Sequence, residues 1–211
     1  MATIPSTKRN AHKKSLKNSK RNATIFPRSR IQVRQTKESY IPPEDWYEHT
    51  YKNSGYKIIQ KPAGKGYIPV VTPAQIRDRL GALPSNFLES LEVVQLSSMT
   101  RKKERLPCYG MQWGQAIYLY PMEDSLIENF YRPPRPSEYQ DAKKFGGRWE
   151  QKKGSKWDLI WTPQTIKDFY LDHVLIHEVG HLIDTQNKSH RDRERFAEWF
   201  AIEYGRRYSS N

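Results

Sequence analysis

The sequence predicts an α+β fold, in which one helix and a few strands precede two long helices. Three observations support this prediction. A helix-start signal opens residues 72–81, segments rich in β-branched and aromatic residues follow at 91–98 and 115–120, and two further helix starts open residues 162–184 and 189–205. We find no internal repeat.

The first helix and the strands have local causes. Thr72 is a typical N-cap, Pro73 suits the first helical position, Gln75 can complete a capping box, and Gly81 ends the pattern. "LEVVQLSS" and "QAIYLY" are typical of strands, and "YRPPRPSEY" is typical of a proline-rich loop. Residues 147–161 are expected to form two short strands around the turn "KKGS".

The two C-terminal helices also begin at clear signals. Thr162 and Pro163 repeat the N-terminal signature and open a helix that we expect to run through "HEVGHLID". Ser189, with Asp192 three positions later, marks the start of the next helix, which ends near Gly205.

The positive charge is concentrated at the N-terminus. Residues 1–40 hold 11 Lys/Arg and one acid, and therefore carry +10 of the chain's net charge of +13. Because this segment lacks apolar periodicity, we expect a disordered basic tail at 1–40. An aromatic and proline-rich connecting segment is expected at 41–71, either as irregular structure or as short strands, and a single folded domain at 72–211.

The composition excludes some classes of protein. Cys108 is the only cysteine, so no intrachain disulfide can form. No apolar run approaches the roughly 18 residues of a membrane span. The N-terminus shows no secretory signal, which favours a cytoplasmic location, although the acid-free residues 1–37 leave a transit peptide open as an alternative.

The segment "HEVGH" carries the clearest chemical signal. Four residues separate His177 from His181, so a helix places both imidazoles on one face, about one turn apart, where they can share one zinc ion per chain. Glu178 lies about 100° around the helix, where its carboxylate can act as a general base toward a metal-activated water without binding the metal. The alternative is a buried structural helix.

A second pair of residues four apart follows in "ERFAEWFA". A catalytic zinc with two histidines needs a third protein ligand, and Glu194 is the candidate, with Glu198 as the carboxylate that orients a ligand histidine. Both glutamates can instead belong to a solvated face, paired with nearby arginines: Arg191, Arg193 and Arg195.

Three other polar residues have weaker claims. His173 lies one turn before His177 and is interpreted as structural, since three histidines over two turns cannot converge on one ion. His190 is an alternative third ligand. Asp184 either supports a ligand histidine or is only the first polar residue at a helix end.

These residues resemble a known group. "HEVGHLID" followed by "ERFAE" is similar to the HExGHxxD…ExxAE pattern of zincin metallopeptidases of the gluzincin type, in particular those like anthrax lethal factor. The resemblance implies His177, His181 and Glu194 as zinc ligands, Glu178 as base and Glu198 beside the ligands. It also implies a small mixed sheet packed on the HExxH helix, with an edge strand that pairs with extended substrate, for which "GQAIYLY" is the best candidate. Many gluzincins use a Tyr or His for the oxyanion, and Tyr204 and Tyr208 are the nearest in sequence.

Two functions follow from these patterns. The first is a zinc-dependent endopeptidase that acts on a protein or peptide substrate. The second is a non-catalytic nucleic-acid- or protein-binding module on the same fold, with the tail as its binding element.

Dense charge with few aromatics favours sequence-independent phosphate contact, although the tail can also be a solubilising extension or meet an anionic membrane surface. The candidate residues are Lys13, Lys14, Lys17, Lys20 and Arg21. The sequence does not indicate the oligomeric state.

Overall fold

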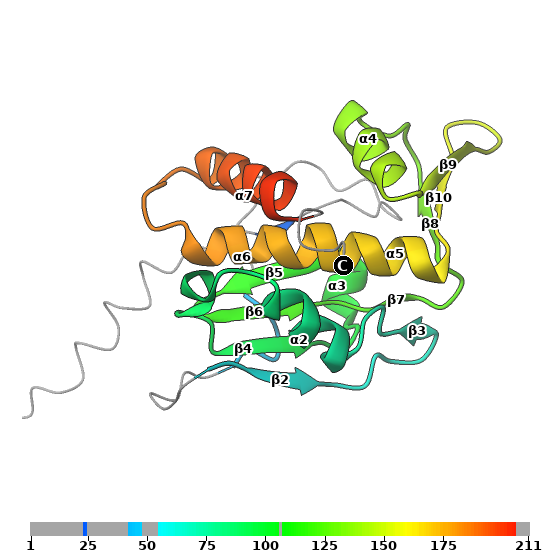
Figure 1. Ribbon diagram of the computed structural model, residues 1–211. Helices are drawn as coiled ribbons and strands as arrows, with labels where there is room; N and C mark the ends of the chain where they lie inside the picture. Colours follow the sequence, from blue (N-terminus) through cyan, green and yellow to red (C-terminus); the bar gives the residue numbers. More distant parts are fainter. Residues whose placement is uncertain (1–22, 25–41, 48–54, 106, 206–211) are drawn as a thin grey trace, which may run out of the picture.

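The structure is a computed structural model that describes residues 23–24, 42–47, 55–105 and 107–205. It confirms an α+β architecture, in which a five-stranded sheet, a long helical run and a C-terminal helix lie in successive layers (Figure 1). Two smaller sheets lie to the side. The strands are β1 (Ala23–Thr24), β2 (Lys57–Gln60), β3 (Tyr67–Ile68), β4 (Val93–Leu96), β5 (Gly110–Trp113), β6 (Ala116–Leu119), β7 (Met122–Glu123), β8 (Ile127–Phe130), β9 (Arg148–Gln151) and β10 (Trp157–Ile160). The helices are α2 (Pro73–Gly81), the 3-10 helix η1 (Ser85–Leu88), α3 (Arg101–Arg105), α4 (Pro136–Lys144), α5 (Pro163–Phe169), the π-helical turn η2 (Tyr170–Val174), α6 (Leu175–Ile183) and α7 (His190–Tyr204).

The five-stranded sheet is mixed, with strand order β1-β5-β6-β4-β2. Strands β2, β4 and β6 are parallel, whereas β5 is antiparallel to β6 and β1 is antiparallel to β5. The expectation that residues 114–120 form the edge strand is wrong. Strand β6 lies between β5 and β4, and all of its residues are buried, because its apolar side chains are covered on both faces. On that side of the sheet the two-residue strand β1 is outermost, and it pairs with Gly110 and Met111 of β5.

Two apolar clusters sandwich this sheet. Alternate residues of a strand point to opposite faces, so Val94 and Ile117 join the large core under the helices, while Val93 and Tyr118 join a smaller cluster on the other face. The segment 42–47 covers that second face, where the Tyr118 hydroxyl accepts a hydrogen bond from the backbone N–H of Tyr47 at 2.8 Å.

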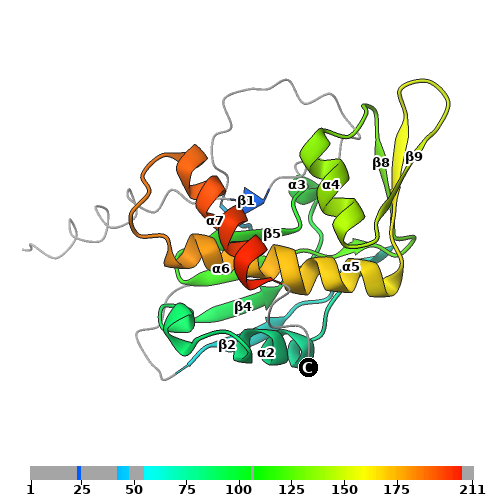
Figure 2. The same ribbon diagram turned by 45° about the horizontal axis from the view of Figure 1, so that its top comes forward.

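The expected helix over 162–184 is present as one continuous run of α5, η2 and α6. Thr162 caps it, accepting from the backbone N–H of Thr165, as the sequence predicts. The turn η2 interrupts the α-helical hydrogen-bond pattern, so that the N–H of Leu175 donates to the carbonyl of Tyr170. Helix α6 then packs on β5 and β6, and α7 covers its other side (Figure 2).

A buried ion pair fixes the helical turn to its neighbours. Arg79 of α2 donates to Asp172 of η2 at 2.7 Å, and the side chains are only 5% and 12% exposed. The same guanidinium donates to the carbonyls of Tyr204 and Gly205, which end α7. A Cβ on Gly205 would meet two backbone carbonyl oxygens, so only glycine fits there. One arginine thus ties α2, η2 and the end of α7 together.

Other expectations were partly right. Strands β9 and β10 flank the "KKGS" turn and form a sheet with β8. The segment 131–139 is not all loop, because α4 begins at Pro136, with the Glu138 carboxylate accepting from the backbone N–H of Arg135. Within 41–71, β2 and β3 are short strands.

The tail is the part that the structure describes least. Ala23–Thr24 form β1, so the expectation of a wholly disordered tail fails at these two residues; the remainder of 1–40 lies outside the described residues. Among the described helices, none is both long and apolar enough to cross a membrane.

Candidate metal and catalytic site

The site forms where α7 crosses α6, and two small residues make the crossing close. A Cβ added to Gly180 would lie 2.9 Å from the Cα of Ala197 and 3.0 Å from the Cβ of Phe200, which is closer than real Cβ contacts. Because Gly180 lies between the two histidines in sequence and Ala197 between Glu194 and Glu198, this approach brings all four side chains to one place. It gives a packing reason for the glycine in "HEVGH" and the alanine in "ERFAE".

Three donors converge at the crossing. The Nε2 atoms of His177 and His181 lie 3.0 Å apart. The carboxylate of Glu194 lies 3.5 Å from Nε2 of His177 and 3.3 Å from Nε2 of His181. The histidine side chains are 3% and 0% exposed, whereas Glu194 is 29% exposed, so the cluster opens toward solvent on the Glu194 side.

This donor set fits a zinc ion. Zinc bonds of about 2.0–2.2 Å in a tetrahedral arrangement place the donors about 3.3–3.6 Å apart. The two nitrogens are 3.0 Å apart, and they lie 3.5 Å from Oε2 and 3.3 Å from Oε1 of Glu194, respectively. The buried Oε1 of Glu194 makes no hydrogen bond to another described residue. Two histidines and a glutamate are also a set used by catalytic zinc sites, which keep a fourth position open.

Electrostatics within the cluster favour a bound cation. Burial lowers the pKa of His177, but the neighbouring carboxylates of Glu194 and Glu198 outweigh burial and raise that pKa to about 10. Burial lowers the pKa of His181 to about 4. Burial would raise the pKa of Glu194, yet the two histidines lower it to about 2. One positive charge is therefore held between carboxylates, and a metal ion that binds deprotonated ligands could take its place.

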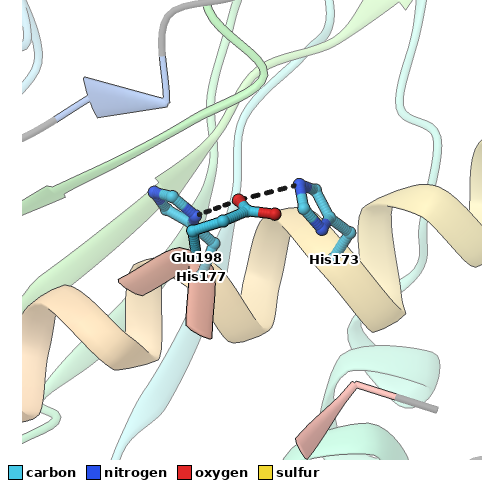
Figure 3. A group of neighbouring side chains, drawn as sticks. All are labelled: His173, His177 and Glu198. Carbon is cyan, nitrogen blue, oxygen red and sulfur yellow. Dashed lines mark ion pairs between the residues drawn. The ribbon is translucent and has the colours of Figure 1, made fainter. Parts of the chain in front are cut away.

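Glu198 lies on the Nδ1 side of the His177 ring, away from the Nε2 atom that approaches His181 and Glu194. Its Oε2 is 3.5 Å from Nδ1 of His177 and 3.7 Å from Nε2 of His173, so it lies between the two rings (Figure 3). Among the described residues, His173, His177 and Glu198 form a second group whose donors lie close enough to hold a metal. The first group is the better candidate for an ion, since both of its imidazoles present Nε2, and a carboxylate near Nδ1 is what orients a ligand histidine in metal sites.

Glu178 is fully buried beside β5. A Cβ on Gly110 would lie 3.0 Å from Oε1 of Glu178 and 2.8 Å from Val174, so the absence of a side chain lets β5 approach the HExxH helix at this carboxylate. Glu178 is not a member of either potential metal group found among the described residues. The negative charge of Glu178 contributes to the raised pKa of His177, so this carboxylate lies near that imidazole.

Asp184 and His190 serve the ends of the helices. The Oδ1 of Asp184 accepts from the backbone N–H groups of Gln186 and Asn187, which stabilises the turn after α6. Its link to a ligand is indirect, through Arg193, which donates to the carbonyls of both Asp184 and His181. His190 is exposed and lies 3.7 Å from Glu194, outside the two groups that the described residues form.

Asp141 is a neighbour of this site that no local sequence pattern indicates. Burial raises the pKa of this α4 carboxyl to about 6, and the charge of Glu198 adds to the rise. Only the fold brings α4 near α7.

Tyr204 lies ten residues beyond Glu194, about 15 Å along the helix, and packs against Phe87 and Phe200. Tyr208 and the tail candidates lie outside the described residues: Lys13, Lys14, Lys17, Lys20 and Arg21.

Neither a scan of protein-family models nor searches of curated proteins and of solved structures give a match to this chain.

Proposed function

We propose that this protein is a zinc-dependent endopeptidase with a zincin-like domain. One observation carries the proposal: two pairs of residues four apart, on consecutive helices, converge so that His177, His181 and Glu194 form a three-donor cluster of zinc-like dimensions. If Glu194 belonged to a solvated charged face, its carboxylate would pair with the arginines of the same helix, α7. Here it faces two buried imidazoles.

The surrounding architecture supports the same proposal. A mixed sheet packs on the HExxH helix, and the next helix supplies the third donor, which is the arrangement that the resemblance to gluzincins implies. The antiparallel strand β5 passes beside Glu178, where Gly110 leaves the backbone close to that carboxylate. A peptide aligned along β5 would therefore lie next to the base.

Each side chain has a separate task in the proposed reaction. His177, His181 and Glu194 would hold the zinc, and Glu198, 3.5 Å from Nδ1 of His177, would orient that ring. A zinc ion bound there would supply Lewis acidity, which polarises a peptide carbonyl and makes a water molecule more acidic. The carboxylate of Glu178 accepts a proton from the attacking water and returns it to the nitrogen of the departing amine.

Two variants and a peptide library test the proposal. Glu178→Gln keeps the size of the side chain but removes the base, so it should retain one zinc per chain by elemental analysis while cleavage falls by about 10²–10⁴-fold. His177→Ala should lose both zinc and activity. Cleavage that survives Glu178→Gln would contradict the mechanism. Zinc-loaded wild-type protein that cleaves nothing in the library would favour the binding module.

A further inference from the structure

The outer edge of β5 is already paired with another part of the same chain. Ala23 lies opposite Met111 and Thr24 opposite Gly110, in an antiparallel register. Strand β1 also lies against α6 (Figure 2). The segment thus reaches the HExxH helix from a position 86 residues before Gly110 in the sequence.

This pairing brings β1 next to the proposed base. Gly110 is the residue whose missing Cβ would touch Oε1 of Glu178, and Thr24 is its partner across the sheet. Antiparallel partners have Cα atoms about 4.5–5.5 Å apart. The backbone of Thr24 therefore passes one strand spacing from the part of β5 that borders Glu178.

A peptide that adds to a sheet edge binds through its main chain, and its side chains only modulate the affinity. Strand β1 has only two residues and therefore makes few hydrogen bonds to β5, so a peptide can displace it more easily than it could displace a long core strand. The segment also continues the sheet in the antiparallel sense that an extended substrate would adopt along β5.

We propose that the segment containing Ala23–Thr24 is a substrate-like strand held in cis, which occupies the peptide-binding edge of β5 and competes with peptides in trans. This inference rests on the proposed function, since it takes β5 as the edge along which substrates lie. It also names a substrate class: extended peptides bound by their main chain, with basic residues on both sides of the paired stretch, as in "KRNATIFPRSR".

Competition in cis has an expected size. A segment tethered in the same chain can act at an effective concentration of about millimolar. If the intrinsic Kd of the cis segment for the edge is about 100 µM or less, a competing peptide would bind about 10-fold more weakly, or worse, to the unmodified chain than to a chain whose β1 cannot pair.

The test uses the full chain carrying Glu178→Gln, so that a bound peptide is not cleaved. Ala23→Pro with Thr24→Pro removes both N–H donors of β1, whichever of them faces β5. Asn10→Pro with Ala11→Pro is the matched control. The ligand is a fluorescein-labelled peptide with the sequence of residues 16–32, and the readout is fluorescence anisotropy.

We expect the peptide to bind the Ala23→Pro/Thr24→Pro chain at least 10-fold more tightly than the unmodified or control chains, and a peptide with the same two prolines not to bind. Equal affinity for all three chains overturns the inference. So does a folded proline variant that binds no peptide, because β1 is then only a structural strand. If the double variant does not fold, Thr24→Pro alone is held to the same criteria.

The outcome is separable from that of the proposed function, because binding needs no turnover. Peptide binding that rises in the proline variant, with no hydrolysis by wild-type protein, contradicts the peptidase and keeps the cis strand. Hydrolysis of library peptides by wild type, with no peptide binding to the proline variant, keeps the peptidase and contradicts the cis strand.

Discussion

The close crossing of α6 and α7 predicts that Gly180→Ala weakens zinc binding without removing a ligand. The new Cβ would lie 2.9 Å from the Cα of Ala197, about 0.5 Å short of ordinary contact, and the obstacle is backbone that cannot rotate away. Because Glu194 and Glu198 are on the same helix as Ala197, a shift of α7 by that amount displaces both. Metal–ligand distances tolerate only about ±0.2 Å.

Two measurements check this prediction. Zinc affinity, from titration against a competing chelator, should fall by about 10–100-fold, the range seen when groups that orient metal ligands are perturbed. The free energy of unfolding of the zinc-free protein, from urea titration, should fall by about 1–3 kcal/mol through overpacking.

Gly81→Ala is the matched control, since nothing lies within 4 Å of a Cβ at that helical glycine. It should leave zinc affinity unchanged and stabilise the protein by up to about 1 kcal/mol, because alanine is favoured over glycine in helices. The two substitutions should therefore change stability in opposite directions. If Gly180→Ala also stabilises the protein and binds zinc as tightly as wild type, the packing argument is refuted.

Three further outcomes follow from the structure and sequence. Arg79→Met should lower the free energy of unfolding by about 3–5 kcal/mol, because it leaves Asp172 buried without its guanidinium. Arg79→Met with Asp172→Leu should recover part of the loss in urea titrations, since the carbonyls of Tyr204 and Gly205 still lack their donor. Glu194→Ala should lose zinc by elemental analysis while His190→Ala keeps it; the reverse pattern would show that the third ligand is wrongly assigned. Any binding of the chain to DNA should weaken steeply with salt, and affinity that stays flat with salt would contradict the electrostatic account. The same binding should be abolished when five tail residues are replaced by Gln: Lys13, Lys14, Lys17, Lys20 and Arg21.

The sequence predicted the elements whose causes are local. The capping box at Thr72 and the N-cap at Ser189 are both formed as expected, since each depends on residues three positions away. The start of α4 was missed because Arg135 is an unusual N-cap, although Pro136 and Glu138 were informative. The pairing order of the sheet could not be predicted, because strand register depends on partners far along the chain.

The same distinction applies to the site. The spacing of His177 and His181 made them neighbours on one face, which required only a helix. Glu194 reaches the two histidines only because α6 and α7 cross closely at Gly180. The role of this glycine could not be predicted from the sequence, because it depends on the position of α7. Asp141 had no local signal at all, since its relation to Glu198 is purely tertiary.

The π-helical turn before α6 sets the phase of His173 relative to the two histidines that follow it. In an uninterrupted α-helix, His173 would stand to His177 as His177 stands to His181, whose ring centroids are 4.7 Å apart. The turn changes that phase, so the rings of His173 and His177 are 6.0 Å apart and His173 stacks on Phe169. The Glu198 carboxylate lies in the wider gap, 3.7 Å from Nε2 of His173 and 3.5 Å from Nδ1 of His177. A break in helical hydrogen bonding thus makes room between two rings for the carboxylate that would orient a ligand histidine.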